Sequence, residues 1–278
     1  MKEIKMVVCD IDDTLITEDC PFPPQVADAV KELQKAGILF TFASGRQPQM
    51  INPYLKELCL DMPVVACNGA LVYHKKRILF HRPIPVKPLI PLIEKADQSD
   101  MTILYCLQQK EYTLRETDYV RQRIKEAGSY HPVRPFSPTE LETAQLDKLV
   151  VMDKAGNIPK LQPLIETLKH DYSFTRYGDI GLEIVSGEVN KAFGIQIIAK
   201  QMGICLNQVM AIGDNENDNL MLRIAGLGIA VGNALPQTKE CADYVCVLSG
   251  PDGVVEAIEQ FCLRRNRNAA VDINEYSV

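Results

Sequence analysis

The sequence lacks the patterns that mark a zinc site or a disulfide framework. It contains no Cys-x-x-Cys pair, and its four histidines are spread along the chain, so no ligand set for zinc is present. Of the nine cysteines, Cys9, Cys67, Cys106 and Cys246 lie in apolar segments. Reduced cysteine packs there as a small hydrophobe, so we expect core thiols without disulfides.

Long apolar runs and an excess of basic residues are also missing. No uninterrupted apolar stretch is long enough to span a bilayer, and residues 1–5 do not begin a secretion signal. Asp and Glu outnumber Lys and Arg by 36 to 30, which gives a net charge of −6 and a pI near 5.4. We therefore expect a cytoplasmic protein that binds neither membranes nor nucleic acid broadly.

Two common nucleotide-binding signatures are absent or misplaced. No G-x-x-x-x-G-K-[ST] string occurs, which excludes a P-loop. The glycines of residues 226–232 resemble a dinucleotide fingerprint, but they flank and enter a predicted strand. A dinucleotide site needs its glycines after a strand and at the start of a helix, so this interpretation is rejected.

Both ends of the chain alternate strands and helices, and 46% of the residues are hydrophobic, which suffices for a packed core. Such alternation predicts crossover connections and a parallel sheet built from both ends. The expected strands cover residues 3–9, 38–43, 64–67, 208–212, 227–231 and 244–247, and the expected helices cover residues 24–36, 48–59, 190–202, 217–224 and 253–261.

The middle of the chain has a different pattern. After a predicted hairpin (71–73 with 77–80) come helices at 86–97, 117–127 and 157–169, strands at 101–107, 111–114, 148–152, 172–177 and 181–185, and a Pro- and Ser-rich loop at 132–139. Such an α+β block is large enough for its own core. We expect a discontinuous core domain, residues 1–83 and 187–278, around an insertion at 84–186. Its polar tail, 264–278, is expected to be poorly ordered.

The strand Met6–Cys9 leads directly into a cluster of acids, Asp10, Asp12 and Asp13. Two carboxylates about 4 Å apart repel by roughly 4 kcal/mol at an effective dielectric constant of about 20. A divalent cation among them would offset that cost. An ordinary acidic turn is the alternative, because Asp is a common loop and N-cap residue.

Three further polar segments follow predicted strands or begin a helix: Ser44-Gly45, Lys191, and Gly213–Asp218. In an open parallel sheet, ligands bind beyond the carboxyl ends of the strands, where backbone N–H groups at helix starts suit a phosphate. Taken singly, each has an ordinary explanation as a turn, a solvated lysine or a set of capping residues. Together they predict one shared site.

The set resembles the haloacid dehalogenase superfamily of phosphatases. Its D-x-D-x-T motif matches Asp10–Thr14, its small hydroxyl residue matches Ser44, its basic residue matches Lys191, and G-D-x-x-N-D matches Gly213–Asp218. Residues 68–70, Asn-Gly-Ala, and the inserted block resemble the Cof-type subgroup with a C2B cap. The resemblance implies an α/β fold with a Rossmann-like parallel-sheet core and an inserted α+β cap domain.

The resemblance also assigns chemical roles. Asp10 is expected to attack phosphorus and form an aspartyl phosphate, while Asp12 protonates the leaving oxygen and later deprotonates water. Mg²⁺ is the expected cofactor, held by Asp10, the main-chain carbonyl of Asp12, and Asp214. Asp218 is expected to hold Lys191 or to orient a metal-bound water. Asp13 is expected to be a solvated turn residue.

Phosphate oxygens are expected to meet Lys191, which also restrains Asp10, and the hydrogen-bond donors Ser44, Asn217 and the N–H groups of Ile11 and Gly45. The implied substrates are small phosphorylated metabolites, sugar phosphates first, with pyridoxal phosphate or flavin mononucleotide as alternatives. A phosphomutase-type transfer and a non-catalytic phospho-ligand-binding module remain open.

The cap is expected to close over the site and read the leaving group, with three possible substrate contacts: Arg176, Tyr177 and Glu183. Each has a structural alternative, since Tyr177 can pack within its strand and Glu183 can pair with a basic neighbour. The sequence does not indicate the oligomeric state.

Overall fold

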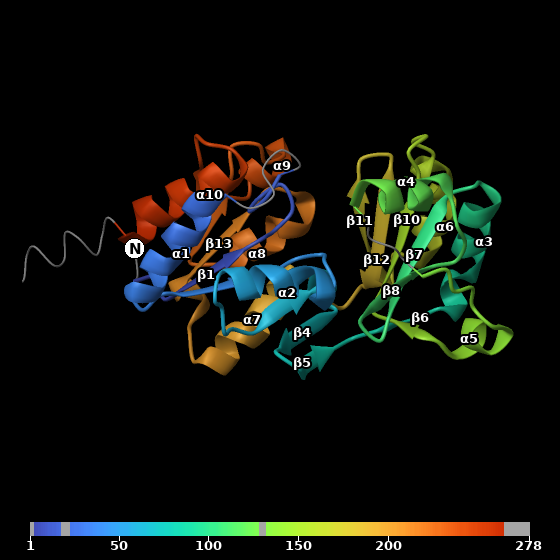
Figure 1. Ribbon diagram of the computed structural model, residues 1–278, viewed down its shortest axis with the longest axis horizontal. Coiled ribbons are helices and arrows are strands. Elements are labelled where there is room, and N and C mark those ends of the chain that lie inside the picture. The colour runs from blue at the N-terminus through green and yellow to red at the C-terminus, as the bar shows by residue number, and fades with distance from the viewer. Residues whose placement is uncertain (1–2, 18–22, 128–131, 264–278) are drawn as a thin grey trace, which may run out of the picture. The chain divides into compact units, whose positions relative to one another are not determined.

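The computed structural model describes residues 3–17, 23–127 and 132–263, which form two compact units (Figure 1). Unit 1 comprises Met1–Gly45, Ile51–Leu79 and Asn190–Val278, and unit 2 comprises Arg46–Met50 and Phe80–Val189. The long segment of unit 2, Phe80–Val189, contains the inserted block expected at residues 84–186, whose boundaries stay a prediction. The tail expected to be poorly ordered, residues 264–278, lies outside the described residues.

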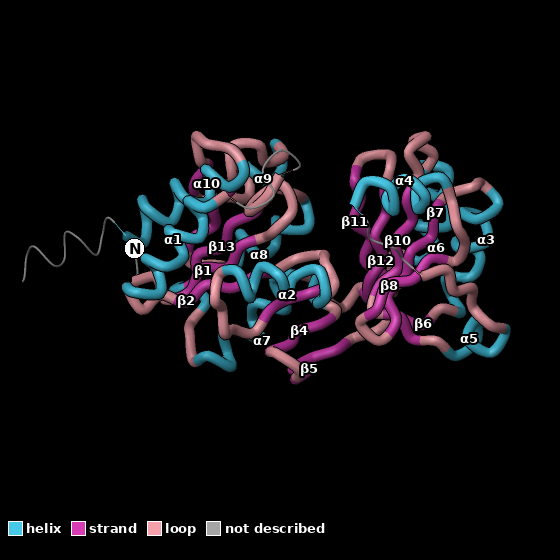
Figure 2. The backbone as a smooth tube through the Cα atoms, viewed as in Figure 1, coloured by secondary structure: helices cyan, strands magenta, loops and turns pink. Residues whose placement is uncertain are grey.

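Unit 1 contains a parallel five-stranded sheet in the order β15-β14-β13-β1-β2 (Figure 2). Its strands are β1 (Met6–Cys9), β2 (Leu39–Phe42), β13 (Val209–Gly213), β14 (Leu227–Ala230) and β15 (Tyr244–Val245). Cys9 pairs with Phe42 on one side and with Ile212 on the other, so the carboxyl ends of the three strands are level. The predicted parallel sheet, built from both ends of the chain, is confirmed.

Every residue of β1, β13 and β14 is buried, because helices cover both faces of this sheet. Helix α1 (Pro24–Lys35) buries residues 26, 29, 30 and 33, a spacing that places them on one face of a helix. The other helices of this unit are α2 (Pro48–Glu57, whose first residues count with unit 2), α7 (Lys191–Met202), α8 (Asn219–Ile224), α9 (Pro236–Lys239) and α10 (Gly250–Ile258), which continues as a π-helical turn, Glu259–Leu263. Among the described residues, none of the helices is both long and apolar enough to cross a bilayer.

A second, small sheet joins β3 (Val64–Ala66), β4 (Leu71–His74) and β5 (Arg77–His81). A parallel bridge from Ala43 to Val65 links it to the end of β2. Between β3 and β4 the chain makes a 3-10 turn, Cys67–Gly69, in which all three residues have positive φ angles of 49°, 50° and 98°. This turn lies at the same edge as the carboxyl ends of the parallel strands.

Unit 2 is built on an antiparallel sheet in the order β11-β12-β10-β7-β8 (Figure 2). Its strands are β7 (Thr102–Leu107), β8 (Lys110–Thr113), β10 (Lys148–Met152), β11 (Tyr172–Tyr177) and β12 (Gly181–Ser186), and the short pair β6 (Ile84–Pro85) and β9 (Gln145–Leu146) adjoins it. Helices α3 (Ile90–Gln98) and α6 (Gln162–Leu168) pack on one face and share a buried apolar cluster with Tyr105, Leu149 and Ile184. Helix α4 (Asp118–Ala127) completes the helices that the sequence predicted here.

The sequence missed one helix of unit 2. Helix α5 (Pro138–Thr143) occupies part of the segment predicted as a loop, and it begins at Ser137, whose hydroxyl accepts a hydrogen bond from the N–H of Glu140. The Glu140 side chain accepts in return from the N–H of Ser137, which completes a capping box. The three prolines of residues 132–139 had favoured a loop, but one of them, Pro138, is the first residue of this helix, where proline is well tolerated.

Candidate active site

The side chain of Lys191 joins two of the predicted motifs. Its ammonium lies 2.6 Å from Asp10 Oδ1 and 2.6 Å from Asp218 Oδ1. All three residues are at least 95% buried, with exposed fractions of 1%, 5% and 0% respectively. Lys191 is the first residue of α7, and Asp10 follows β1 directly, so residues far apart in sequence form one buried charge cluster.

Asp218 is held by groups from its own loop as well as by Lys191. Its Oδ2 accepts hydrogen bonds from the N–H groups of Asp214 at 3.0 Å and Asn215 at 3.1 Å. A Cβ atom on Gly213 would lie 2.6 Å from the Asp218 side chain, so only glycine leaves room for this arrangement. With both oxygens engaged, Asp218 orients Lys191 and the loop after β13.

Asp214 is linked to the first motif by Thr14. The Thr14 hydroxyl, which is fully buried, donates a hydrogen bond of 2.6 Å to Asp214 Oδ1. This contact fixes one oxygen of Asp214 and directs the other away from Thr14. The loop after β13 and the loop after β1 are therefore connected by a second contact besides Lys191.

Burial dominates the electrostatics of the site. It raises the pKa of Asp10 well above 3.8, and the carboxylates of Asp218 and Asp214 act in the same direction against the opposing effect of Lys191. Burial, followed by the charge of Asp218, raises the pKa of Asp214 from 3.8 to about 7. Burial alone would lower the pKa of Lys191, but Asp10 and Asp218 outweigh it and raise that pKa, so the ammonium stays charged.

The charges and ligand atoms fit a divalent cation. Carboxylate oxygens of Asp10, Asp214 and Asp218 lie within 4.8 Å of one another, and Lys191 supplies a single positive charge among these three acids. A dication would balance the remaining two negative charges, and buried charges are otherwise costly. Asp218 already uses both oxygens, which leaves the side chains of Asp10 and Asp214 for a hard cation. Mg²⁺ and its individual ligands stay predictions.

The predicted phosphate-binding residues Ser44 and Asn217 meet through Asn68. The Asn68 N–H donates to the Ser44 carbonyl at 3.0 Å, and Asn217 Nδ2 donates to Asn68 Oδ1 at 3.0 Å. Ser44 and Asn68 are buried, while Asn217 is half-buried. The segments after β2, β3 and β13 are thus held together at one edge of the sheet.

The loop after β1 turns sharply beyond Asp10. The Ile11 side chain is buried and its carbonyl accepts from the N–H groups of Leu15 and Ile16, whereas Asp12 and Asp13 are exposed. Asp13 has a φ angle of 58°, which Asp tolerates in tight turns. Gly45, another predicted phosphate-binding residue, is half-buried. The roles given to Asp12, Ile11 and Gly45 remain predictions.

The three predicted substrate contacts of unit 2 bond to neighbours within that unit. Glu183 is buried and forms an ion pair of 2.9 Å with Lys148, as its structural alternative expected. The Tyr177 hydroxyl also donates to Glu183, at 3.2 Å, and Arg176 hydrogen-bonds to Gln162. Their role in reading a substrate is still a prediction.

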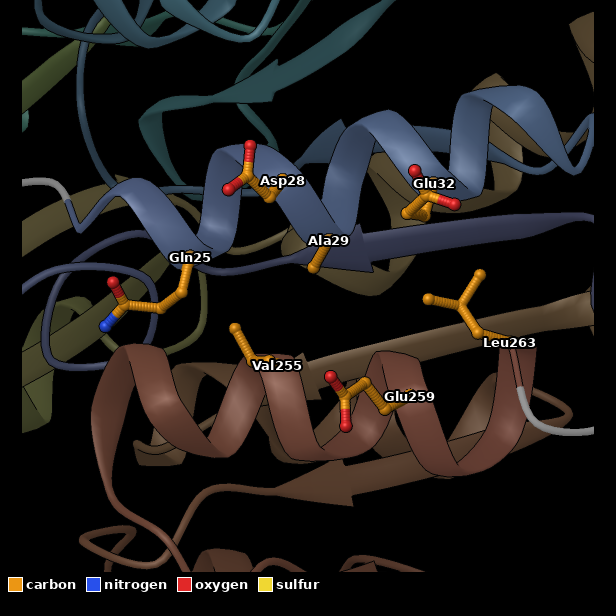
Figure 3. Close-up of a pocket in the computed structure, with 7 residues that line it drawn as sticks. All are labelled: Gln25, Asp28, Ala29, Glu32, Val255, Glu259 and Leu263. Atoms are coloured by element: carbon orange, nitrogen blue, oxygen red, sulfur yellow. The ribbon is translucent and has the colours of Figure 1, made fainter.

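Two surface pockets of unit 1 lie outside the motif cluster. One of about 380 Å³ lies between α1 and α10, where Ala29 and Val255 point toward each other beside Asp28 and Glu259 (Figure 3). The other, of about 430 Å³, lies between the end of α2 and the β4-β5 turn near Asp61. None of the predicted site residues lines either pocket.

The structure adds residues whose roles the sequence did not indicate. Thr14 and Asn68 were quoted only as parts of motifs, yet they bond directly to Asp214 and Asn217. Asn190 begins α7 by accepting a hydrogen bond from the N–H of Phe193 at 2.9 Å, which sets the start of the helix that carries Lys191. An Asn before an apolar helix is a recognisable capping signal, so this last role was open to prediction.

Comparison with known proteins agrees with this geometry. The family model described as haloacid dehalogenase-like hydrolase matches residues 7–258, which include every motif residue above. The chain belongs to the haloacid dehalogenase-like hydrolase family. The predicted family, the α/β fold class and the hydrolase class are therefore confirmed.

Similar members of the family cover almost the whole chain. The chain is 25% identical to "Putative phosphatase YkrA" of Bacillus subtilis, over 93% of this chain and 98% of that protein. It is 27% identical to "Pyridoxal phosphate phosphatase YbhA" of Escherichia coli, over 92% and 97%. Among solved structures, the haloacid dehalogenase subclass IIB sugar phosphatase BT4131 shares the fold with a TM-score of 0.80 at 20% identity, over 92% and 98%.

Proposed function

We propose that the protein is a Mg²⁺-dependent phosphatase that hydrolyses small phosphorylated metabolites through an aspartyl phosphate on Asp10. The observation that carries this proposal is the buried bridge from Lys191 to Asp10 and Asp218, at 2.6 Å to each. A charged ammonium held against a carboxylate at the end of a parallel strand both fixes a nucleophile and neutralises a phosphate.

In the first step, Asp10 attacks phosphorus in line with the leaving oxygen, and Asp12 gives that oxygen a proton. Because Lys191 holds Oδ1 of Asp10, the other oxygen is the attacking atom. Asp12 is exposed, so its carboxyl group is accessible to a substrate from solvent. The products of this step are an alcohol and the aspartyl phosphate.

In the second step, Asp12 takes a proton from water, whose oxygen attacks the phosphorus and releases orthophosphate and free Asp10. Lys191, Ser44 and Asn217, with the N–H groups of Ile11 and Gly45, bind the phosphate oxygens throughout. The carboxylates of Asp10 and Asp214 and the carbonyl of Asp12 would hold Mg²⁺, which supplies positive charge for the transferred phosphoryl group. Asp218 keeps Lys191 in place.

The domain assignment of the proposal follows the expected boundaries, with residues 1–83 and 187–278 as the core and 84–186 as a cap that reads the leaving group. Sugar phosphates are the first substrate class. Pyridoxal phosphate, which the name of the Escherichia coli relative contains, is the alternative to include in any substrate panel. A cytoplasmic location fits such metabolites.

The test is orthophosphate release from p-nitrophenyl phosphate with and without Mg²⁺, followed by a panel of phospho-metabolites. We expect Asp10→Asn to lower kcat by roughly 10³-fold or more, because the nucleophile is lost. Asp12→Asn should slow turnover while phosphate still binds. The matched control is Asp28→Asn, an exposed acid on α1. Full activity of the Asp10 variant, or of the wild type in chelator, would contradict the proposal.

The same assay separates hydrolysis from transfer. A phosphatase releases orthophosphate in water alone, whereas a phosphomutase needs a sugar acceptor and returns a phosphorylated sugar. A non-catalytic module would bind orthophosphate without turnover.

A further inference from the structure

Asn68 connects the other polar segments of the site. Its N–H donates to the Ser44 carbonyl, and its Oδ1 accepts from Asn217 Nδ2, each at 3.0 Å. The following residue, Gly69, contacts the backbone of Asn190 next to Lys191. We propose that Asn68 is a positioning residue: it orients the amide of Asn217 so that this amide donates to a phosphate oxygen. This inference rests on the proposed function.

The backbone at Asn68 has an uncommon conformation. Cys67, Asn68 and Gly69 have consecutive positive φ angles of 49°, 50° and 98°, although only the last is glycine. Such strain persists only where the surroundings enforce it, and it concentrates at functional sites. Here the bond to Ser44 and a bond from the Ala70 N–H to the Cys67 carbonyl, at 3.0 Å, hold the turn. The Asn68 side chain is only 3% exposed, so it is placed rigidly.

The bond from Asn217 to Asn68 determines the orientation of the Asn217 amide, because it places Nδ2 toward Asn68 Oδ1. With Asn68 Oδ1 facing Asn217, as in the structure, reversing the Asn217 amide alone would bring Asn217 Oδ1 against Asn68 Oδ1, and two acceptors cannot hydrogen-bond. The orientation is kept although it leaves Asn217 Oδ1 buried with no partner among the described residues. The Asn217 NH₂ group has two hydrogens, of which Asn68 takes one. The other is the donor for phosphate.

The same turn supports Lys191 through its backbone. A Cβ atom at position 69 would lie 2.2 Å from the carbonyl oxygen of Asn190. The turn is therefore in direct contact with Asn190, the residue before α7. Asn190 is the cap of α7, and Lys191 follows it. Moving the backbone of the turn would therefore shift both Asn217 and the start of α7. A variant that tests the Asn68 side chain must for this reason leave the backbone of the turn in place.

The decisive experiment is a double-mutant cycle of Asn68→Gly and Asn217→Ala. Glycine adopts positive φ freely, so Asn68→Gly keeps the turn and removes only the side chain. With wild-type Asn217, we expect Asn68→Gly to lower kcat/KM for p-nitrophenyl phosphate by about 10- to 100-fold, as a misplaced binding group does. In the Asn217→Ala background, the same change should alter kcat/KM less than about 2-fold, because residues that act as a unit are not additive.

Equal losses in both backgrounds would overturn the inference, since Asn68 would then act independently of Asn217. Unchanged activity of Asn68→Gly alone would overturn it as well. Thermal unfolding of all four proteins identifies a merely structural effect. Such an effect would lower the unfolding temperature of Asn68→Gly without any coupling between the two substitutions in kcat/KM. The matched control is Asn157→Gly in unit 2, with expected wild-type kinetics.

A second readout separates this inference from the proposed function. Isothermal titration calorimetry of the same four proteins with orthophosphate measures phosphate binding without turnover. If the wild type fails to hydrolyse any ester, the proposed function fails, but coupled losses of orthophosphate affinity would still support the role of Asn68. If hydrolysis is normal and neither kinetics nor affinity shows coupling, the inference fails alone.

Discussion

Thr14 and Asp214, 200 positions apart in the sequence, share a buried hydrogen bond of 2.6 Å. The bond joins the loop after β1 to the loop after β13, at strand ends that the sheet register already makes level. It also gives Asp214, whose pKa is raised by burial, one of the few groups that favour its charged form. Thr14 is thus expected to control how readily Asp214 ionises and binds a cation.

Replacing Thr14 by Val should weaken cation binding. The loss of a hydrogen bond to a charged group costs about 1.5–3 kcal/mol, so the apparent affinity for Mg²⁺ should fall at least roughly tenfold. Activity measured against Mg²⁺ concentration gives this affinity. Thr14→Ser retains the hydroxyl group and should stay close to the wild type. An unchanged Mg²⁺ dependence in Thr14→Val would show that Asp214 does not bind the metal.

The stability of the metal-free protein should depend on pH through Asp214. Its pKa is about 7 when folded and 3.8 when unfolded, so the folded state binds more protons between these values. The stabilisation is complete below about pH 4 and is lost as the pH rises through 7. Since Mg²⁺ competes with that proton, the increase in Tm caused by Mg²⁺ should be larger at pH 8 than at pH 6. Asp214→Asn should reduce this difference, and Asp10, whose pKa burial also raises, accounts for the remainder.

Gly69→Ala should destabilise the protein more than Gly37→Ala does. Both glycines have positive φ, 98° and 72°, so alanine is strained at either position by about 1 kcal/mol. Only at position 69 would the new Cβ meet the Asn190 carbonyl, whereas nothing lies within 4 Å at position 37. The extra loss should be about 1–3 kcal/mol by urea unfolding. Equal losses would mean that the turn moves away freely.

The buried pair of Lys148 and Glu183 in unit 2 allows a test by removal and repair. Replacing Glu183 alone by Leu leaves the Lys148 charge buried, which should cost about 3–5 kcal/mol. Adding Lys148→Met should recover most of that loss, because both charges are then gone. Thermal or urea unfolding measures the effect. The control is Glu142→Gln, which breaks an exposed pair with Lys87 and should cost less than about 1 kcal/mol.

The sequence alone was sufficient to predict the alternating strands and helices of the core and much of the motif cluster. The strand β1 is buried throughout, so it appears in the sequence as a continuous apolar run. The helix α1 is buried on one face, so its apolar residues recur with the period of a helix. The parallel sheet then required the ends of β1 and β13 to meet, which brings Asp10, Asp214 and Asp218 together without any knowledge of their contacts. Motif resemblance supplied the chemistry.

Other features were beyond pattern reading. Nothing in a single sequence says that Asn217 bonds to Asn68, because that contact depends on the strained turn after β3 and on the register of separate sheets. Short elements such as α9 contain too few residues to show a period. In unit 2, Glu183 lies between the apolar residues Leu182 and Ile184 of β12, and its partner Lys148 is known only once the sheet is paired.

The central place of β1 has a consequence for synthesis of the chain. The partner β2 follows within about thirty residues, but β13 begins only at Val209, after the whole inserted unit. At roughly 5–20 residues per second, the ribosome needs about 10–40 s to reach it. During that time the nascent chain carries one open edge of the buried strand β1, whereas all residues of unit 2 are synthesised before β13. Chaperone dependence of folding should therefore arise in the first segment of the chain.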